Sequence, residues 1–170
     1  MTVAPATIAV RKAGKSDAAA MAAVHAVAWR EAYLGILPHT IIDAMIARRG
    51  PARWAGVLAK PNGFRVIEFG GEVAGYTSFG PARNRIMAAK SEIYEIYLAP
   101  VYQGIGLGCR LFSDTRDAAD KTHGAGLIVW VLTENRRAVA FYRALGGKPG
   151  PGGIEQLGEQ RFEKSSFLWV

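Results

Sequence analysis

The sequence predicts an α/β protein built on a mixed β-sheet with helices on both faces. Three observations support this. Short apolar runs with strand alternation recur along the chain, stretches with helical spacing separate them, and a glycine-rich segment at residues 104–108 joins a strand pattern directly to a helix pattern. The chain has 170 residues, of which 50% are hydrophobic. We therefore expect residues 1–170 to form one domain with a full core, because this length is too short for two.

The first third of the chain predicts one strand and three helices. Residues 7–11 alternate as a short strand, and Ser16 offers an N-cap to a helix that ends near residue 34. A second helical pattern stops at residues 48–50. Pro51 then stands where a first-turn proline would open another short helix.

The middle of the chain predicts a hairpin and a further strand. Residues 64–69 and 72–79 are strand patterns, and the glycines at residues 70–71 between them predict a tight turn. The two strands should therefore pair antiparallel. A basic loop at residues 81–90 leads to the next strand at residues 92–98.

The last part of the chain predicts a parallel strand pair. A helix over residues 107–121 precedes a continuous apolar run at residues 127–132, which is typical of a central strand buried on both faces. The strand at residues 92–98, this helix and this run form one crossover unit, so the two strands should be parallel. A helix over residues 135–145, glycine-rich turns and a terminal strand over residues 161–170 complete the chain.

The composition excludes several kinds of site. Cys109 is the only cysteine, which rules out an internal disulfide and a thiolate-rich metal site, and we expect it to be a small buried residue. The three histidines are too scattered to suggest metal ligands, so no metal is expected. No apolar stretch is long enough to span a membrane, and residues 1–8 lack the pattern of a secretion signal. We therefore expect a cytoplasmic protein without a membrane partner.

The net charge of +7 suggests attraction to an anionic partner, whether nucleic acid, a membrane surface or a phosphorylated cofactor. The arginines occur mostly as singles and pairs, without the basic stripe and interleaved aromatics of single-strand binders. Nucleic acid is therefore not the favoured partner.

The three glycines at residues 104, 106 and 108 predict an anion-binding loop. Without a Cβ atom, each leaves its backbone N–H group open, and the free amides and positive dipole end of the following helix face the same place. A phosphate is the expected ligand. The alternative is that the glycines only turn the chain, because glycines often do so.

Three separate segments, in this order, resemble one family. Residues 103–108 (QGIGLG) fit the pattern Gln/Arg-x-x-Gly-x-Gly/Ala, and residues 135–146 (NRRAVAFYRALG) are similar to Asn-x-x-Ala-x-x-Phe-Tyr-x-x-x-Gly. Residues 28–38 (AWREAYLGILP) show a weaker likeness to a first helix and its loop. The chain resembles the GNAT superfamily of acetyl-CoA-dependent N-acetyltransferases. A dinucleotide-binding fold is rejected, because no acidic residue ends a parallel strand at the expected distance after the glycines.

The resemblance implies a mostly antiparallel central sheet of six to seven strands, in which two neighbouring parallel strands splay apart. It also implies acetyl-CoA as cosubstrate. The amides of the glycine loop would hold the pyrophosphate, and backbone groups near Ile96 and Leu98 would hold the pantetheine arm. Asn135 would bind the pantetheine amides, cap its helix, or do both. The residues that the resemblance assigns to the cosubstrate are Ile96, Tyr97, Leu98, Gln103, Gly104, Ile105, Gly106, Leu107, Gly108, Asn135, Ala138 and Tyr142.

Two proton transfers require partners in such a reaction. Tyr142 occupies the tyrosine position of the family's Phe-Tyr pattern and is the candidate acid for the leaving thiolate, and the alternative is a core aromatic residue. Glu92 is the candidate base, because the resemblance places it where some family members carry a glutamate that deprotonates the acceptor. Strand alternation puts it on the same face as Leu98, whereas Glu95 falls on the opposite face. Each glutamate has the alternative of an ordinary solvent-facing carboxylate, and a base acting through water is also left open.

The predicted activity is transfer of acetyl to a primary amine of a small molecule or peptide, by direct attack through a tetrahedral intermediate. Trp29 and Tyr33 would form the wall of the acceptor pocket, and the alternative for both is plain core packing. The basic loop, with Arg83 and Arg85, favours an acceptor that carries a carboxylate or phosphate over a polyamine.

A second hypothesis is a non-catalytic module that senses acyl-CoA or a basic domain that binds nucleic acid. The intact loop signature and Tyr142 argue against it. The oligomeric state is left open, although the apolar residues 166–170 could pair with another subunit at a sheet edge to form a homodimer.

Overall fold

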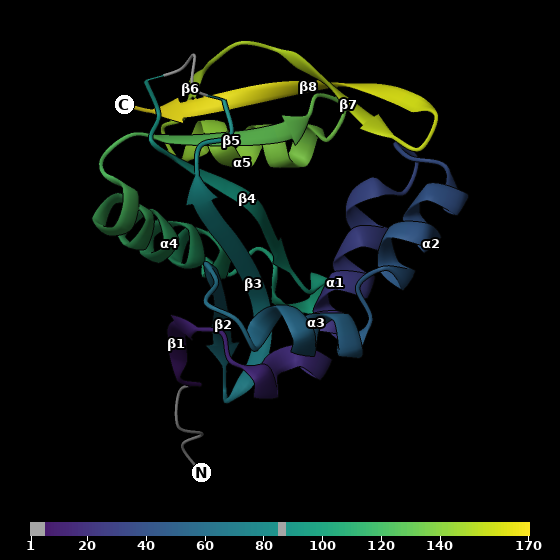
Figure 1. Cartoon of the computed structure of the whole chain (residues 1–170), viewed down its shortest axis with the longest axis vertical. Helices are drawn as coiled ribbons and strands as arrows, with labels where there is room; N and C mark the ends of the chain where they lie inside the picture. Colours follow the sequence, from purple (N-terminus) through teal and green to yellow (C-terminus); the bar gives the residue numbers. More distant parts are fainter. Residues whose placement is uncertain (1–5, 85–87) are drawn as a thin grey trace.

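The structure is a computed structural model that describes residues 6–84 and 88–170. Arg85 of the basic loop lies outside the described residues, as do most of residues 1–8. One eight-stranded sheet runs in the order β1-β2-β3-β4-β5-β8-β6, and β7 pairs with β8 (Figure 1). The strands are β1 (Ile8–Lys12), β2 (Phe64–Phe69), β3 (Glu72–Pro81), β4 (Ser91–Leu98), β5 (Leu127–Leu132), β6 (Lys148–Pro149), β7 (Gly153–Leu157) and β8 (Gln160–Trp169).

The helices are α1 (Ala18–Tyr33), α2 (His39–Ala47), α3 (Pro51–Leu58), α4 (Leu107–His123) and α5 (Arg136–Ala144). The mixed and mostly antiparallel sheet is confirmed, since β4 and β5 form its parallel pair. The sheet gains strands because β6 and β7 lie where only turns were expected. Among the described residues, no helix is long and apolar enough to cross a membrane.

The start of α1 differs from the prediction. Ser16 does not cap the helix but lies in a short 3-10 turn, Lys15–Asp17, and Asp17 is the residue before α1. The Asp17 carboxylate accepts hydrogen bonds of 2.8 Å from the Gly14 N–H and from both terminal nitrogens of Arg11. These bonds join β1 to the start of α1. The prediction for α3 is confirmed, because Gly50 caps it and Pro51 is its first residue.

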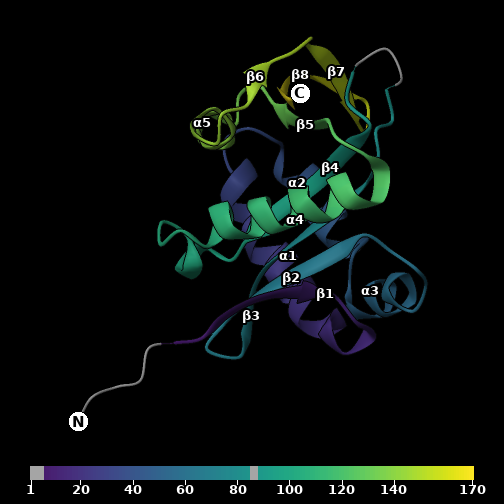
Figure 2. The same ribbon diagram turned by 90° about the vertical axis from the view of Figure 1, so that its left-hand side faces the viewer.

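Two helical layers cover the sheet. On one face α4 lies across the strands, as Figure 2 shows, and packs Leu107 and Leu111 against Ile67. The other face carries α1 and α3, where Met21 and Trp54 pack against the sheet. Apolar surface on each face is thereby removed from water, which is the main source of stability for such a domain.

The parallel strands β4 and β5 pair over only part of their length. Their register covers Ser91 to Ile93 against Leu127 to Val129, after which β4 runs on to Leu98 without a β5 partner. Tyr94, directly after the last paired residue, is skipped in the pairing of β4 with β3. Such a bulge bends its strand and increases the local twist. We infer that the bulge directs β4 away from β5 and so opens the sheet.

The expected subunit contact through residues 166–170 loses its basis. β8 is not an edge strand in this region, because it lies between β5 on one side and β6 on the other. Its backbone groups at Phe167 and Leu168 therefore already face strand partners.

We predict that Gly75→Ala destabilises the fold near this opening. A Cβ atom at Gly75 would lie 2.5 Å from Leu98 Cδ2 and 2.6 Å from the Tyr97 carbonyl oxygen. Overpacking of this kind costs about 1–3 kcal/mol in the free energy of unfolding, measurable by urea denaturation. Gly56→Ala is the matched control, because Gly56 lies inside α3 and a Cβ atom added there would have no neighbouring heavy atom within 4 Å. The free energy of unfolding should rise by up to about 1 kcal/mol. Equal effects of the two substitutions would contradict this account.

Candidate active site

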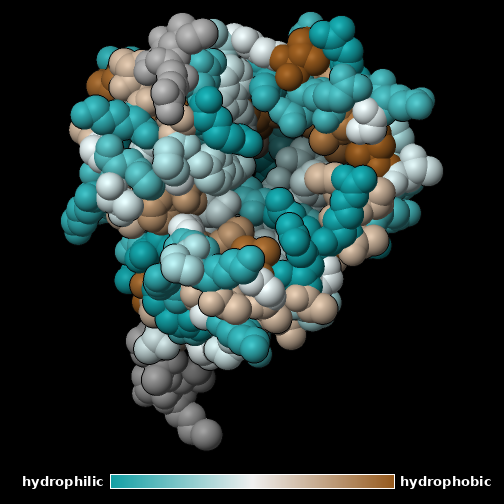
Figure 3. All heavy atoms as spheres, in the orientation of Figure 1, coloured by the Kyte–Doolittle hydropathy of each residue, from teal (hydrophilic) through white to brown (hydrophobic). Residues whose placement is uncertain are grey.

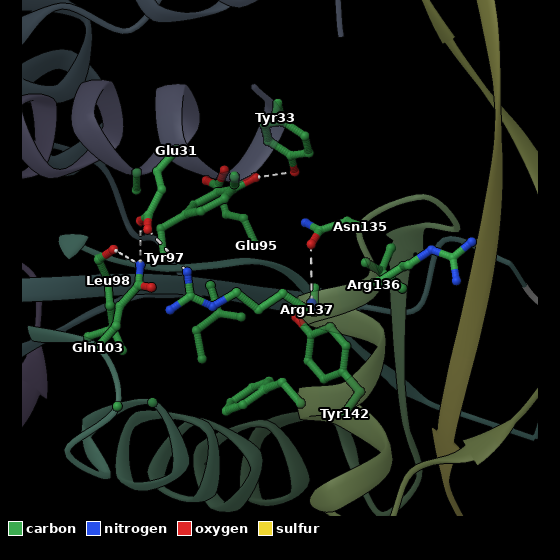
Figure 4. A pocket seen from close by; sticks show the side chains of 18 of the residues that line it. Glu31, Tyr33, Glu95, Tyr97, Leu98, Gln103, Asn135, Arg136, Arg137 and Tyr142 are labelled. Atoms are coloured by element: carbon green, nitrogen blue, oxygen red, sulfur yellow. Dashed lines mark hydrogen bonds and ion pairs between the residues drawn. The ribbon is translucent and has the colours of Figure 1, made fainter. Parts of the chain in front are cut away.

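A pocket of about 610 Å³ begins where β4 and β5 separate, and α1, α5 and the glycine loop complete its walls (Figure 4). It brings together most of the residues assigned from the sequence. Those that line it are Tyr33, Ile96, Tyr97, Leu98, Gln103, Gly104, Gly106, Gly108, Asn135, Ala138 and Tyr142. Four do not line it, namely Trp29, Glu92, Ile105 and Leu107.

The backbone of β4 offers unpaired groups to this pocket. The Ala99 N–H donates to the Ala74 carbonyl at 2.9 Å, so alternation along the antiparallel pair turns the N–H and C=O groups of Ile96 and Leu98 away from β3. They point into the gap on the β5 side. The side-chain amide of Gln103 donates to the Leu98 carbonyl at 3.0 Å and so holds the glycine loop against the strand end.

The glycine loop exposes backbone amides at the start of a long helix. Gly104 and Gly106 have φ angles of +77° and +88°, in the left-handed region, and Gly106 caps the 17-residue helix α4. No heavy atom lies within 4 Å of the Cβ position at either glycine. The space in front of the first turn is therefore open to an anion.

Gly108 serves a different purpose from the other two glycines. A Cβ atom there would lie 3.2 Å from Leu98 Cδ1 and from Phe141 Cε2, so Gly108 allows α4 to approach β4 and α5 closely. Cys109, expected to be buried, is exposed and lines the pocket.

Asn135 and Tyr142 are among the residues of the α5 segment that line the pocket. The Asn135 side-chain oxygen accepts a hydrogen bond of 3.1 Å from the Ala138 N–H, so Asn135 caps α5 while it lines the pocket. Tyr142 is 5% exposed, packs against Phe112 and Phe167, and turns its hydroxyl toward Asn135 (Figure 4). Burial raises the pKa of Tyr142 well above that of a free phenol, so its hydroxyl stays protonated and can donate.

The placement of Glu92 corrects the sequence analysis. Cross-strand partners share a face, and Glu92 pairs with Gly80 whereas Leu98 pairs with Gly75, so Glu92 does not lie on the face of Leu98. Strand alternation failed because the skipped residue Tyr94 shifts the register by one. The Glu92 side chain is 1% exposed and bonded to the Arg83 guanidinium at 2.5 Å and to the Arg83 N–H at 3.0 Å.

Glu95 is the carboxylate that reaches the pocket. It lies on the face opposite Leu98, as alternation predicted, together with Tyr97. Arg49, from the link between α2 and α3, holds both of its oxygens through Nη1 at 2.7 and 2.5 Å, and Ser78 donates to one of them at 3.3 Å. The sequence offered Arg49 only as the end of a helix, with no signal that it contacts β4.

An aromatic and polar cluster lies beside Glu95, between α1 and the sheet. The hydroxyls of Tyr33 and Tyr97 lie 2.9 Å apart, and His25 Nδ1 lies 2.7 Å from the Tyr76 hydroxyl. Burial raises the pKa of Tyr33 and of Tyr97, so both phenols stay neutral near pH 7. Trp29 packs on Tyr33 with ring centroids 4.5 Å apart, so it supports the pocket wall from behind.

A charged bridge spans the pocket from α1 to α5. The Glu31 carboxylate accepts hydrogen bonds from Gln103 Nε2 at 3.2 Å and from Arg137 Nη1 at 3.1 Å (Figure 4). The sequence analysis did not single out this bridge. Among the described residues, no group of three or more side chains is placed to hold a metal ion.

Known proteins resemble the chain both in sequence and in fold. The Acetyltransferase (GNAT) family model matches residues 19–146 of the chain. This chain belongs to the GNAT family. YuaI of Bacillus subtilis, an uncharacterized N-acetyltransferase, is 28% identical to this GNAT protein over 156 residues, which are 92% of this chain and 85% of YuaI.

Two solved structures share the fold. The PaiA N-acetyltransferase of Thermoplasma acidophilum, in complex with coenzyme A, superposes with a TM-score of 0.73 at 19% identity, covering 94% of this chain and 98% of PaiA. YncA of Salmonella typhimurium, with its cofactor acetyl-CoA, superposes with a TM-score of 0.67 at 20% identity, covering 96% and 93%. The GNAT fold expected from the sequence is confirmed, and the protein is an acyltransferase of the N-acetyltransferase type. The alternative of a non-catalytic module is not supported.

The buried histidine beside the pocket predicts how stability depends on pH. Burial lowers the pKa of His25 to about 4, whereas an unfolded histidine has a pKa of about 6.5. Between these values the unfolded chain binds a proton that the folded chain does not, so stability falls as the pH drops from about 6.5 to 4, by up to about 3 kcal/mol. Urea denaturation at a series of pH values measures this loss.

His25→Gln should flatten this slope between pH 6.5 and 4. The control is His39→Gln at an exposed histidine, which should keep the slope of the unmodified protein. If His25→Gln leaves the slope unchanged, His25 is not the group responsible.

Proposed function

We propose that the protein transfers the acetyl group of acetyl-CoA to a primary amine of a small molecule or peptide. The observation that carries this proposal is the incomplete pairing of β4 and β5, which leaves the backbone of Ile96 and Leu98 facing a pocket that ends at the glycine loop. The coenzymes in the PaiA and YncA structures support acetyl-CoA as the cosubstrate.

In this proposal the cosubstrate lies along the opened edge of β4. The amides from Gln103 to Gly108 hold the pyrophosphate, because Gly104 and Gly106 keep the space before α4 clear. The N–H groups of Ile96 and Leu98 and the C=O group of Ile96 bind the pantetheine arm as a neighbouring strand would, while the Leu98 C=O group stays bonded to Gln103. Asn135 both caps α5 and offers its side-chain amide nitrogen to the same arm.

The amine attacks the thioester carbonyl directly in the proposed reaction. A β4 N–H group that faces the gap donates to the oxygen on which negative charge develops, which stabilises the tetrahedral intermediate. The attack forms the carbon–nitrogen bond of the amide, and the carbon–sulfur bond then breaks. The Tyr142 hydroxyl protonates the departing thiolate and regains a proton from solvent. Burial raises the pKa of Tyr142, so the proton is present at neutral pH.

Glu95 replaces Glu92 as the proposed base. Its carboxylate lines the pocket, whereas Glu92 is enclosed by Arg83 outside it. Glu95 would take the proton that the amine loses, directly or through a water molecule, and pass it to solvent. Tyr33 remains the proposed pocket wall on the acceptor side, with Trp29 behind it, and Tyr97, which the sequence assigned to the cosubstrate, joins Tyr33 there through its hydroxyl.

Two measurements on the unmodified protein and on a Tyr142 variant test the proposal: calorimetry for acetyl-CoA binding and thiol release for turnover. The unmodified protein should bind acetyl-CoA and release thiol when a mixed panel of amines is added. Tyr142→Phe should bind acetyl-CoA equally well and slow turnover by about 10- to 10³-fold, because only the proton donor is lost. An absence of acetyl-CoA binding by the unmodified protein would overturn the proposed function, and unchanged turnover would remove Tyr142 from the mechanism.

The two glutamates of β4 form a matched pair for the base. Glu95→Gln should slow turnover by about 10- to 10³-fold at neutral pH without weakening acetyl-CoA binding. Glu92→Gln removes the same charge three residues away, outside the pocket, and should change turnover little while it lowers the free energy of unfolding by about 1–3 kcal/mol. The reverse ranking of the two variants in the thiol-release assay would restore Glu92 as the base.

A further inference from the structure

One face of β4 carries two carboxylates, each covered by an arginine from another segment. Arg83 lies over Glu92 and Arg49 lies over Glu95, with shortest N–O distances of 2.5 Å in both pairs. In each pair the arginine is the outer partner. The exposed fractions of the side chains are 66% for Arg83 and 35% for Arg49, against 1% and 10% for the two glutamates.

Aromatic rings hold both guanidinium groups in place. Arg83 stacks on Tyr94 at 4.8 Å from the ring centroid, and Arg49 lies 5.5 Å from the ring centroid of Trp54. Cation–π contacts favour a fixed guanidinium plane. A molecule that approaches this face of β4 therefore meets an ordered guanidinium group beside each carboxylate.

The surface is hollowed at this place. Figure 3 shows a depression over β4, between the β5–β8 part of the sheet and the helices α1 and α2. Glu95 belongs both to this face of β4 and to the lining of the pocket. The Arg49 guanidinium lies 2.5 Å from the Glu95 carboxylate. When an acceptor amine is within hydrogen-bond reach of Glu95, a group a few bonds from its nitrogen is consequently close to Arg49.

Arg49 retains donors for a second anion. A guanidinium has five N–H donors, and the bonds to Glu95 use only Nη1, which carries two of them. One further donor serves the neighbouring Tyr76 hydroxyl at most. A second ammonium group on the acceptor would instead be repelled by Arg49. The two carboxylates that line the pocket, Glu31 and Glu95, are each ion-paired with an arginine, so a second ammonium group would have to compete with that arginine.

We propose that the acceptor is a primary amine that carries an oxyanion, a carboxylate or a phosphate, within a few bonds of its nitrogen, and that Arg49 binds this oxyanion. The proposal rests on the proposed acetyl transfer and names its acceptor class. Arg49 is then the specificity-determining residue, with a planar set of donors suited to a carboxylate or phosphate.

The test compares amines in matched pairs. Each pair contains an oxyanion-bearing amine and its uncharged twin, for example leucine with leucinamide and phosphoethanolamine with ethanolamine, and spermidine represents polyamines. Two readouts are taken, kcat/KM from thiol release with acetyl-CoA, and the shift in Tm of the coenzyme A-saturated protein. The carboxylate and phosphate pairs separate the two sources of the oxyanion. At least one oxyanion-bearing amine should exceed its twin by about 10-fold or more in kcat/KM.

Substitution of Arg49 should remove this discrimination. Arg49→Met is expected to lower the ratio of kcat/KM between twins by about 10- to 100-fold. The ratio cancels any effect on Glu95, because both twins use the same chemistry. Arg49→Lys keeps the charge and should retain part of the ratio, which covers the case in which Arg49→Met fails to fold. Arg30→Met removes an exposed arginine paired with Asp43 on the surface and should leave the ratio unchanged.

Three results would overturn the proposal: preference for the uncharged twins or spermidine, an unchanged ratio in both Arg49 variants, or no response of either readout to any oxyanion-bearing amine. Each is distinct from failure of the proposed function, because acetyl-CoA binding is measured first by calorimetry. If acetyl-CoA binds and the twins behave as described, both proposals stand.

Discussion

The structure depends on the incomplete pairing of two neighbouring strands, β4 and β5. β4 remains paired with β3 and β5 with β8, so each strand is held in place while the edge between them is open past Ile93. Unpaired backbone groups are costly when buried, and they are tolerated here because they face a pocket. The glycine loop follows from the same arrangement, since it begins where the opened strand ends, and Gln103 ties that loop to Leu98.

Charge is distributed around this opening as compensated pairs. On the face of β4 that carries Glu92 and Glu95, each carboxylate is covered by an arginine. Across the pocket, Glu31 joins Arg137 to Gln103. A carboxylate with as little exposure as Glu92 persists in a protein interior only when it is paired and hydrogen-bonded. Glu92 therefore belongs to the framework, where it fastens the segment that leads into β4, while the same residue type three positions later borders the pocket.

Local patterns in the sequence were sufficient for most of the framework. The glycine loop, the crossover unit, the hairpin before it and the position of Tyr142 each depend on residues close together in the chain, and their placement was confirmed. Features that depend on distant partners were not accessible. Arg49 meets Glu95 across 46 positions, and neither spacing nor composition indicates that contact. Glycine and proline dominate the segment before β8, and this composition predicts turns where the structure has the two short strands β6 and β7.

The misplacement of Glu92 came from a single residue. In a regular strand the side chains alternate between the two faces, which predicts that Glu92 and Leu98 share a face. Tyr94 is an extra residue relative to β3 and breaks this alternation. Removal of Tyr94 would leave every other residue of β4 opposite its present partner on β3, because Ser78 and Phe79 are already consecutive. The bulge would be lost, and with it the bend that we infer to separate β4 from β5. A single deletion at this position would therefore act on the opening of the sheet without turning Glu95 or Leu98 to another face.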